Sequence, residues 1–167
     1  RTMHLLQLTL QRSSAINATA YGCFSGNKAQ EVIIARNNAL EVLRIEGTDM
    51  PKIISVSYQP AFCVIRSLCT FRLVGSGKDY IAIGSDSGKI TIMEFSIETS
   101  ELKSVHSETF GKTGCRRIVP GQYLAADPNG RALMIGAIEK QKLVYVMNRD
   151  ASSRLTISSP LEAHKAQ

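Results

Sequence analysis

A hairpin of two short apolar strands recurs along the chain. It occurs in EVIIARNNALEVLRI, DYIAIGSDSGKITIMEF and RALMIGAIEKQKLVYVM, where a short polar turn joins two aliphatic strands. The turn centres lie near Asn38, Ser87 and Lys140, which are 49 and 53 residues apart. A repeat of this length that is built only from strands is typical of β-propeller blades, in which each sheet is covered by its neighbours. This recurrence therefore predicts a β-propeller.

The remaining apolar segments are also short, rich in Ile, Val and Leu, and bounded by Gly, Asn, Asp or Ser, which is the pattern of strands. No window of ten residues keeps a helical period. We expect strands at residues 5–10, 18–24, 31–36, 39–45, 52–56, 64–73, 80–84, 89–95, 102–110, 122–126, 131–138 and 142–147.

The fold class expected is all-β, a partial propeller of about three antiparallel blades, similar to kelch or WD repeats. The blades should lie near residues 5–56, 62–110 and 122–150, with 151–167 beginning the next connection. A propeller ring needs about four to eight blades, so three cannot close one. A β-sandwich of about twelve strands in one domain is the structural alternative.

Two glycine-containing segments are interpreted as turns. In GSDSGK, Gly88 suits a positive φ and Asp86 is able to bond its own backbone. In DPNGR, at residues 127–131, the proline presets one turn position and Asn129-Gly130 supplies the rest. Because glycine and asparagine fill such positions for backbone reasons, neither segment is expected to be a binding site.

The segment FGKTGCRRIVPGQ, residues 110–122, contains Gly-Lys-Thr, which raises the possibility of a phosphate-binding loop. That motif needs a glycine five residues before Gly111, and His106 stands there. A helix should also follow, but Pro120 disfavours helix at Val119. No nucleotide site is therefore expected here.

No metal, cofactor or catalytic set is predicted. No C-x-x-C pair occurs, and Cys63 and Cys69 would lie about 20 Å apart along one strand. GSDSG fails the nucleophile elbow because its central residue is Asp86. No complete set of nucleophile, base and orienting residue is visible, so we expect no enzyme and no small-molecule substrate. The cysteines and histidines are too dispersed for zinc: Cys23, Cys63, Cys69, Cys115, His4, His106 and His164.

The charge of the chain permits an acidic partner without requiring one. Twenty Lys and Arg against fourteen Asp and Glu give a net charge of +6 and a pI near 9.3. The basic residues are scattered, whereas nucleic-acid footprints are normally clustered. No apolar run approaches the roughly 18 residues of a membrane span, so no membrane association is expected.

The segment 110–122 is long for a connection in a compact domain, and such loops often carry function. Adjacent arginines suit carboxylates of a partner, aliphatic residues can bury against it, and proline lowers the entropy lost on binding. A solvated loop between blades is the alternative. The residues expected to contact the partner are Lys112, Arg116, Arg117, Ile118, Val119 and Pro120.

Several runs carry a family resemblance. They are LTLQR, VIRSL, KDYIAIGSDSGKI, ETFGKTGCRRIVPGQYLAADPNGRA, AIEKQKLVYVMNRD and RLTISSPLEAHKA. They resemble the N-terminal part of the large propeller subunits of splicing factor 3b. These belong to a family of three-propeller scaffolds with the large subunits of the damaged-DNA-binding complex and of the cleavage and polyadenylation specificity factor. The resemblance covers nearly the whole chain and departs from the family pattern at residues 44–63.

The resemblance implies the first propeller of a larger, non-catalytic nuclear scaffold. It implies partners among the helical-repeat and small subunits of splicing factor 3b and the spliceosomal ribonucleoprotein, with indirect pre-mRNA or small nuclear RNA association. The alternative is a nucleic-acid-binding propeller of the damaged-DNA-binding or polyadenylation type. The resemblance also implies that the tail from Asn148 to Ala166 faces partners, which adds Arg149, Arg154, Glu162 and His164 to the expected contact residues.

Overall fold

The computed structural model describes residues 10, 12, 14–26, 28–109, 121–138, 141–152, 154–159 and 161–164. These residues form thirteen strands and no helix, so the expected all-β class is confirmed. None of them belongs to a helix that is long and apolar enough to cross a membrane. The strands are β1 (Ala18–Gly22), β2 (Glu31–Arg36), β3 (Ala39–Glu46), β4 (Lys52–Pro60), β5 (Ile65–Phe71), β6 (Tyr80–Ser85), β7 (Lys89–Ser96), β8 (Glu101–Thr109), β9 (Tyr123–Ala126), β10 (Ala132–Ile138), β11 (Gln141–Arg149), β12 (Leu155–Ile157) and β13 (Leu161–His164).

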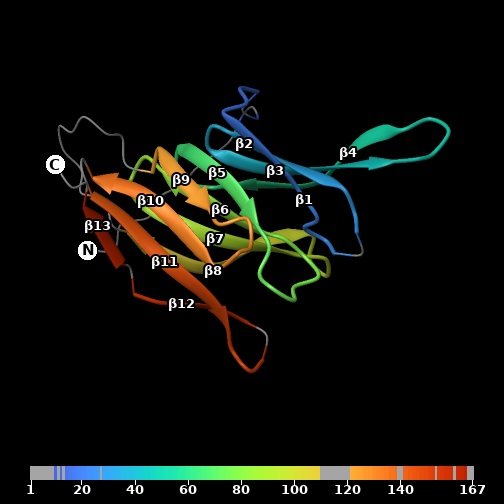
Figure 1. Ribbon diagram of the computed structural model, residues 1–167. Helices are drawn as coiled ribbons and strands as arrows, with labels where there is room; N and C mark the ends of the chain where they lie inside the picture. The colour runs from blue at the N-terminus through green and yellow to red at the C-terminus, as the bar shows by residue number, and fades with distance from the viewer. Residues whose placement is uncertain are drawn as a thin grey trace, which may run out of the picture.

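The strands form three antiparallel sheets that lie side by side (Figure 1). The first sheet has the order β1-β2-β3-β4, the second β5-β6-β7-β8, and the third β9-β10-β11 with β12 and β13. Every strand pairs with a neighbour in the sequence except β13, which returns to β11. Consecutive four-stranded meanders are the architecture of propeller blades, so the expected partial propeller is confirmed.

The fourth strand position of the third sheet is shared by two short strands. Met147, Asn148 and Arg149 of β11 pair with β12, whereas residues 141–144 pair with β13. Between them, Ser158 donates its N–H to the carbonyl of Val146, and its hydroxyl accepts from the Val146 N–H. Thus residues after 150, where we expected the next connection to begin, continue the edge of the third sheet.

The apolar core lies between consecutive sheets, because alternate side chains of each strand face opposite neighbours. Ile81 and Ile83 of β6 pack toward the first sheet, and Tyr80 and Ala82 toward the third. Residues shared by the first and second sheets are Phe24, Ile33, Ala35, Leu40, Val42, Ile65, Ile81, Ile83, Phe95 and Leu102. Residues shared by the second and third sheets are Phe71, Leu73, Tyr80, Ala82, Ile90, Ile92, Leu133, Ile135, Leu143, Tyr145 and Met147.

The expected turn at Gly88 is confirmed. Its φ is 77°, and its N–H donates to the Ser85 carbonyl at 3.0 Å. Asp86 acts differently from the expectation: its carboxylate accepts from the backbone N–H of Val64 at 3.2 Å. The side chain therefore ties the turn to the entrance of β5 instead of closing the turn on itself.

Two glycines allow the second and third sheets to approach through their backbones. Gly121, with a φ of 75°, lies against Ser85 so closely that a Cβ would overlap the Ser85 backbone. Gly130, with a φ of 67°, lies in the same way against the Arg72 carbonyl. No side chain fits at either point. The contact of Gly121 with Ser85 lies at the end of the sheets that includes Gly88, named here the Gly88 end. The contact of Gly130 with Arg72 lies at the opposite end, named here the Gly130 end.

The expected strands between residues 18 and 147 correspond closely to β1–β11, with boundaries that differ by a few residues. The largest difference is at β4, which continues to Pro60; β5 is shorter than expected at both ends, and β11 is longer at both ends. The strand expected at 5–10 lies outside the described residues except for Leu10, which is not in a strand.

Candidate docking surface

The segment expected to dock a partner joins β8 to β9. Residues 110–120, and with them Lys112 and Arg116 to Pro120, lie outside the described residues. Their flanks are described: Thr109 pairs with Lys89, and Gly121 lies against Ser85. Both flanks therefore lie at the Gly88 end of the second and third sheets.

The four expected contact residues of the tail do not lie together. Arg149 ends β11 and Arg154 precedes β12, which places both at the Gly130 end. Glu162 and His164 belong to β13, where His164 pairs with Gln141 at the start of β11, toward the Gly88 end. Arg149 and Arg154 therefore lie at one end of the third sheet, and His164 lies toward the opposite end.

Three ion pairs lie at the Gly130 end, where Arg149 also lies. Arg72 Nε lies 2.6 Å from Asp79 Oδ1, Lys78 Nζ lies 2.9 Å from Glu94 Oε2, and Arg131 Nε lies 3.0 Å from Asp127 Oδ2. The hydrogen bond from the Arg131 side chain lowers the pKa of Asp127. The hydrogen bond and charge of Asp79 raise the pKa of Arg72. These groups are thus neutralised within the chain.

Arg149 itself contacts the backbone instead of a carboxylate. Its Nη1 donates to the Val74 carbonyl at 2.9 Å, and no ion pair of Arg149 occurs among the described residues. Its guanidinium lies over Gly75, where a Cβ would approach Nη1 to 2.8 Å. Arg149 lines two neighbouring pockets. One of about 220 Å³ is lined by Leu73, Val74, Gly130, Arg131, Met147, Asn148 and Arg149, and one of about 390 Å³ by Gly26, Ser76, Gly77, Lys78, Tyr80, Glu94 and Arg149.

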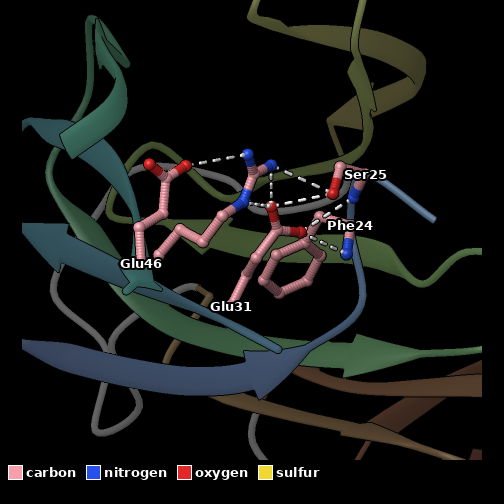
Figure 2. Close-up of polar contacts among 5 residues, drawn as sticks. Phe24, Ser25, Glu31 and Glu46 are labelled. Carbon is pink, nitrogen blue, oxygen red and sulfur yellow. Dashed lines mark hydrogen bonds and ion pairs between the residues drawn. The ribbon is translucent and has the colours of Figure 1, made fainter. Parts of the chain in front are cut away.

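A buried carboxylate organises the same end of the first sheet. Glu31 is 0% exposed and accepts the backbone N–H groups of Phe24 and Ser25 at 2.9 and 2.8 Å. Figure 2 shows this carboxylate between those N–H groups and the guanidinium of Arg44, which also reaches Glu46. Burial alone would raise the pKa of Glu31, but the hydrogen bonds from Ser25 and Arg44 outweigh it and lower the pKa.

This cluster holds the connection between β1 and β2 in a fixed shape, and a second carboxylate attaches it to the second sheet. The N–H of Cys23 donates to Asp79 Oδ2 at 2.7 Å, and Asp79 also pairs with Arg72. Further out, the Gln59 side chain bonds the N–H and the carbonyl of Leu102 at 3.0 and 3.1 Å. The first and second sheets are therefore linked at the Gly130 end through Asp79 and between their outer strands through Gln59.

Glu31, Arg44 and Gly75 have structural roles that were not expected from the sequence. The signal for the first was a glutamate at the start of the apolar strand EVIIAR, because a carboxylate in a buried strand needs donors nearby. No sequence signal identifies Gly75, since its role depends on Arg149, which is distant in the chain.

The described residues hold no group of three or more His, Cys, Asp or Glu that would bind a metal ion. Cys23, Cys63 and Cys69 are free thiols, and burial raises the pKa of Cys69 to about 12. A thiol with so high a pKa is a poor nucleophile at neutral pH. The surface formed by the connections between strands is therefore the strongest candidate for function in the described part of the chain.

Comparison with known proteins identifies relatives over nearly the whole sequence. The chain is 58% identical to "Pre-mRNA-splicing factor RSE1" of Mycosarcoma maydis, 55% to "Splicing factor 3B subunit 3" of Danio rerio and 57% to "Spliceosome-associated protein 130 A" of Arabidopsis thaliana. Each alignment covers 98% of the chain and 13% of the relative. These relatives confirm the resemblance to propeller subunits of splicing factor 3b.

A family model described as "RSE1/DDB1/CPSF1 first beta-propeller" matches residues 15–167. The match begins just before β1 and includes all thirteen strands. The three antiparallel sheets of the structure agree with a propeller family. The chain therefore belongs to the RSE1/DDB1/CPSF1 first beta-propeller family.

Proposed function

We propose that the protein is a non-catalytic scaffold subunit of the spliceosomal splicing factor 3b complex. In this role it supports recognition of the intron branch site in the nucleus through protein contacts. The observation that carries the proposal is the identity of 55 to 58% with relatives named as splicing factors, along 98% of the chain. The chain spans 13% of the length of these relatives, so the proposal concerns the part that this propeller plays in a longer protein.

A scaffold role is supported by where the polar groups of the described residues lie. The buried carboxylate of Glu31 and the partly buried carboxylate of Asp79 are bonded to donors of the chain itself, and the cysteine with the most perturbed pKa is unreactive. A catalytic carboxylate or thiol would instead face a cleft and keep hydrogen-bonding capacity available for a substrate. These groups hold the sheets in place and leave the connections between strands to contact partners.

The proposed docking surface has two parts. The first part comprises Lys112, Arg116, Arg117, Ile118, Val119 and Pro120, which belong to a connection whose described flanks, Thr109 and Gly121, lie at the Gly88 end. Residues 110 to 126 carry three cations and no carboxylate, which favours an acidic partner surface. At the Gly130 end and along β13 lie Arg149, Arg154, Glu162 and His164. The proposed partners are the helical-repeat and small subunits of the complex and, through them, the spliceosomal ribonucleoprotein.

The test is purification of the full-length protein through an affinity tag under native conditions. Copurification of the other splicing factor 3b proteins and of a small nuclear RNA, together with loss of splicing when the protein is depleted from a nuclear extract, is the expected result. Splicing that continues at full rate after depletion would contradict the proposal. Changing Arg116 and Arg117 singly to alanine should weaken subunit copurification in one variant and lower stability in the other.

A second candidate function is direct binding of nucleic acid, which the net charge of +6 favours. Phosphate contacts would make the affinity fall steeply with salt, at roughly one power of the salt concentration for each phosphate neutralised. Filter binding of single-stranded RNA at two salt concentrations distinguishes the candidates. A scaffold shows weak binding with a shallow salt slope.

A further inference from the structure

Arg149 differs in its contacts from the other cations at the Gly130 end. Three of these, on Arg72, Lys78 and Arg131, are each bonded to a carboxylate of the same chain. Arg149 shares their surroundings but has no ion pair among the described residues, and a single hydrogen bond to Val74 holds it. A guanidinium carries five N–H donors, so most of its bonding capacity remains for another molecule.

The position of this guanidinium is set by the fold. Gly75 has a φ of 75° and leaves room for Nη1 of Arg149 in its present position, because a Cβ at Gly75 would lie 2.8 Å from Nη1 and displace the guanidinium. The bond to the Val74 carbonyl then fixes the direction of the planar group. A charged group that is already oriented loses less conformational entropy on binding, so a partner gains more from it.

The surroundings of Arg149 fit an extended chain. Arg149 lines both the pocket of about 220 Å³ and the pocket of about 390 Å³, and it is the one residue that the two linings share. Val74, in the smaller pocket, is 69% exposed, which leaves an apolar contact beside the cation. Tyr80 lines the larger pocket and stacks on Phe71, with ring centroids 5.7 Å apart, so that wall is rigid.

From this geometry we infer that the groove across Arg149 binds an extended segment of a partner protein in which a carboxylate side chain lies next to an apolar one. The carboxylate pairs with the guanidinium of Arg149, and the apolar side chain covers Val74. This inference extends the proposed scaffold function, because it gives the scaffold a specific peptide-binding groove at the Gly130 end.

The charges around the groove favour one carboxylate over a nucleic-acid backbone. Asp79, Glu94 and Asp127 neutralise the cations beside them, so a chain of phosphates would meet three ion pairs without net charge and the one unpaired guanidinium of the groove. Nucleic-acid sites instead concentrate unpaired cations along a track. A single planar guanidinium with an apolar neighbour matches one Asp or Glu in a peptide.

The experiment places a photo-crosslinking amino acid at Val74 of the full-length protein, purified with its natural partners under native conditions. Irradiation followed by mass spectrometry identifies the segment that crosslinks. We expect a partner-protein segment with an Asp or Glu within about four residues of the crosslinked position, a reach set by roughly 3.3 Å per residue. Crosslinks only to RNA or to a second copy of the chain, or no crosslink, would overturn the inference.

Variants then test the role of the charge. Arg149→Gln should lower the crosslink yield on the order of tenfold, as expected for loss of a charge-assisted, bidentate contact. Lys28→Gln is the matched control: Lys28 is exposed, has no ion pair among the described residues, lines neither pocket, and keeps its φ of 59° with an unbranched side chain. An equal loss in both variants would show a general charge effect and sink the inference.

Reversing the charges of both Arg149 and the partner's carboxylate tests whether the two groups pair directly. Changing the partner's carboxylate to Lys should abolish the crosslink, and Arg149→Glu in the same complex should restore it. Failure of that rescue counts against a direct pair. Copurification of the complex is measured in the same samples, so an intact complex without Arg149-dependent crosslinking disproves the groove while leaving the scaffold proposal standing.

Discussion

Two hairpins of the protein place apolar pairs at the same position with opposite outcomes. In the second sheet, Phe95 pairs with Leu102 one step before the turn, and the two are 1% and 3% exposed. In the first sheet, Ile45 pairs with Ile53 at the equivalent step, and they are 63% and 71% exposed. Phe95 and Leu102 pack against the first sheet, whereas Ile45 and Ile53 lie on the opposite face of the first sheet, which no other sheet covers in the described part of the chain.

In this fold, therefore, a paired apolar side chain is buried by the adjacent sheet and not by its own hairpin. The same holds at the other side, where Tyr123 and Met134 of the third sheet are 57% and 40% exposed while their neighbours Leu133 and Ile135 are fully buried. Each additional sheet would convert such exposed pairs into core. We expect further sheets of the longer relatives to cover these two faces.

The largest effect is expected from truncating the buried pair. Phe95→Ala should lower the free energy of unfolding by about 3 to 5 kcal/mol, as Phe truncations in cores do, whereas Ile45→Ala in the 167-residue chain should change it by less than about 0.5 kcal/mol. Urea denaturation followed by circular dichroism measures both.

The same Ile45→Ala substitution in the full-length protein tests whether another sheet covers this pair. There, Ile45→Ala should cost about 2 to 4 kcal/mol if another sheet covers the pair, as buried Ile truncations do. A cost that stays near zero in the full-length protein would show that the first sheet keeps a free face.

The next effect compares two glutamates on opposite faces of the first sheet. Glu31→Gln should cost about 2 to 3 kcal/mol, because it weakens several charge-assisted hydrogen bonds in a buried site. Glu41, which is 8% exposed, lies on the face that no other sheet covers and bonds only two side chains, Arg36 and Ser55, among the described residues, so Glu41→Gln should cost about 1 kcal/mol. Equal thermal shifts for the two variants would mean that the neighbouring sheet contributes nothing to the Glu31 site.

A smaller effect separates backbone strain from burial. Gly88→Val should cost about 1 to 3 kcal/mol, because a β-branched residue is strained at a φ of 77°. Gly77 is the control: a Cβ there meets nothing within 4 Å and its φ is not in the left-handed region, so Gly77→Val should leave the melting temperature almost unchanged. A normal melting curve for Gly88→Val would disprove the strain.

The smallest effect is the dependence on pH. The pKa of Glu31 is lowered from its ordinary value of 4.5, so its ionised form stabilises the fold above that pH, and the contribution is lost as the pH falls through the lowered value. The stability difference between the native protein and Glu31→Gln should therefore shrink in acid. A difference that stays constant from neutral pH to about pH 3 would contradict this assignment.

The sequence predicted the strands, the turn at Gly88 and the propeller class because these depend on local pattern: apolar alternation, polar turns and a repeat near 50 residues. It did not predict the partner of Asp86, the role of Gly75 or the separation of Arg149 from His164. Each of these depends on which strand ends meet in space. Spacing along the chain carries no such information until the order of strands within a sheet is known.

The sequential order of the strands also bears on how the protein is made. Residues 18–60 contain every strand of the first sheet, and residues 65–109 every strand of the second. Each sheet can thus pair its strands as soon as it leaves the ribosome, because none waits for a distant segment. The core between two sheets then forms when the later one emerges. Until then Phe24 and Ile33 are exposed, so a pause in translation after residue 60 would leave the nascent chain most open to chaperones.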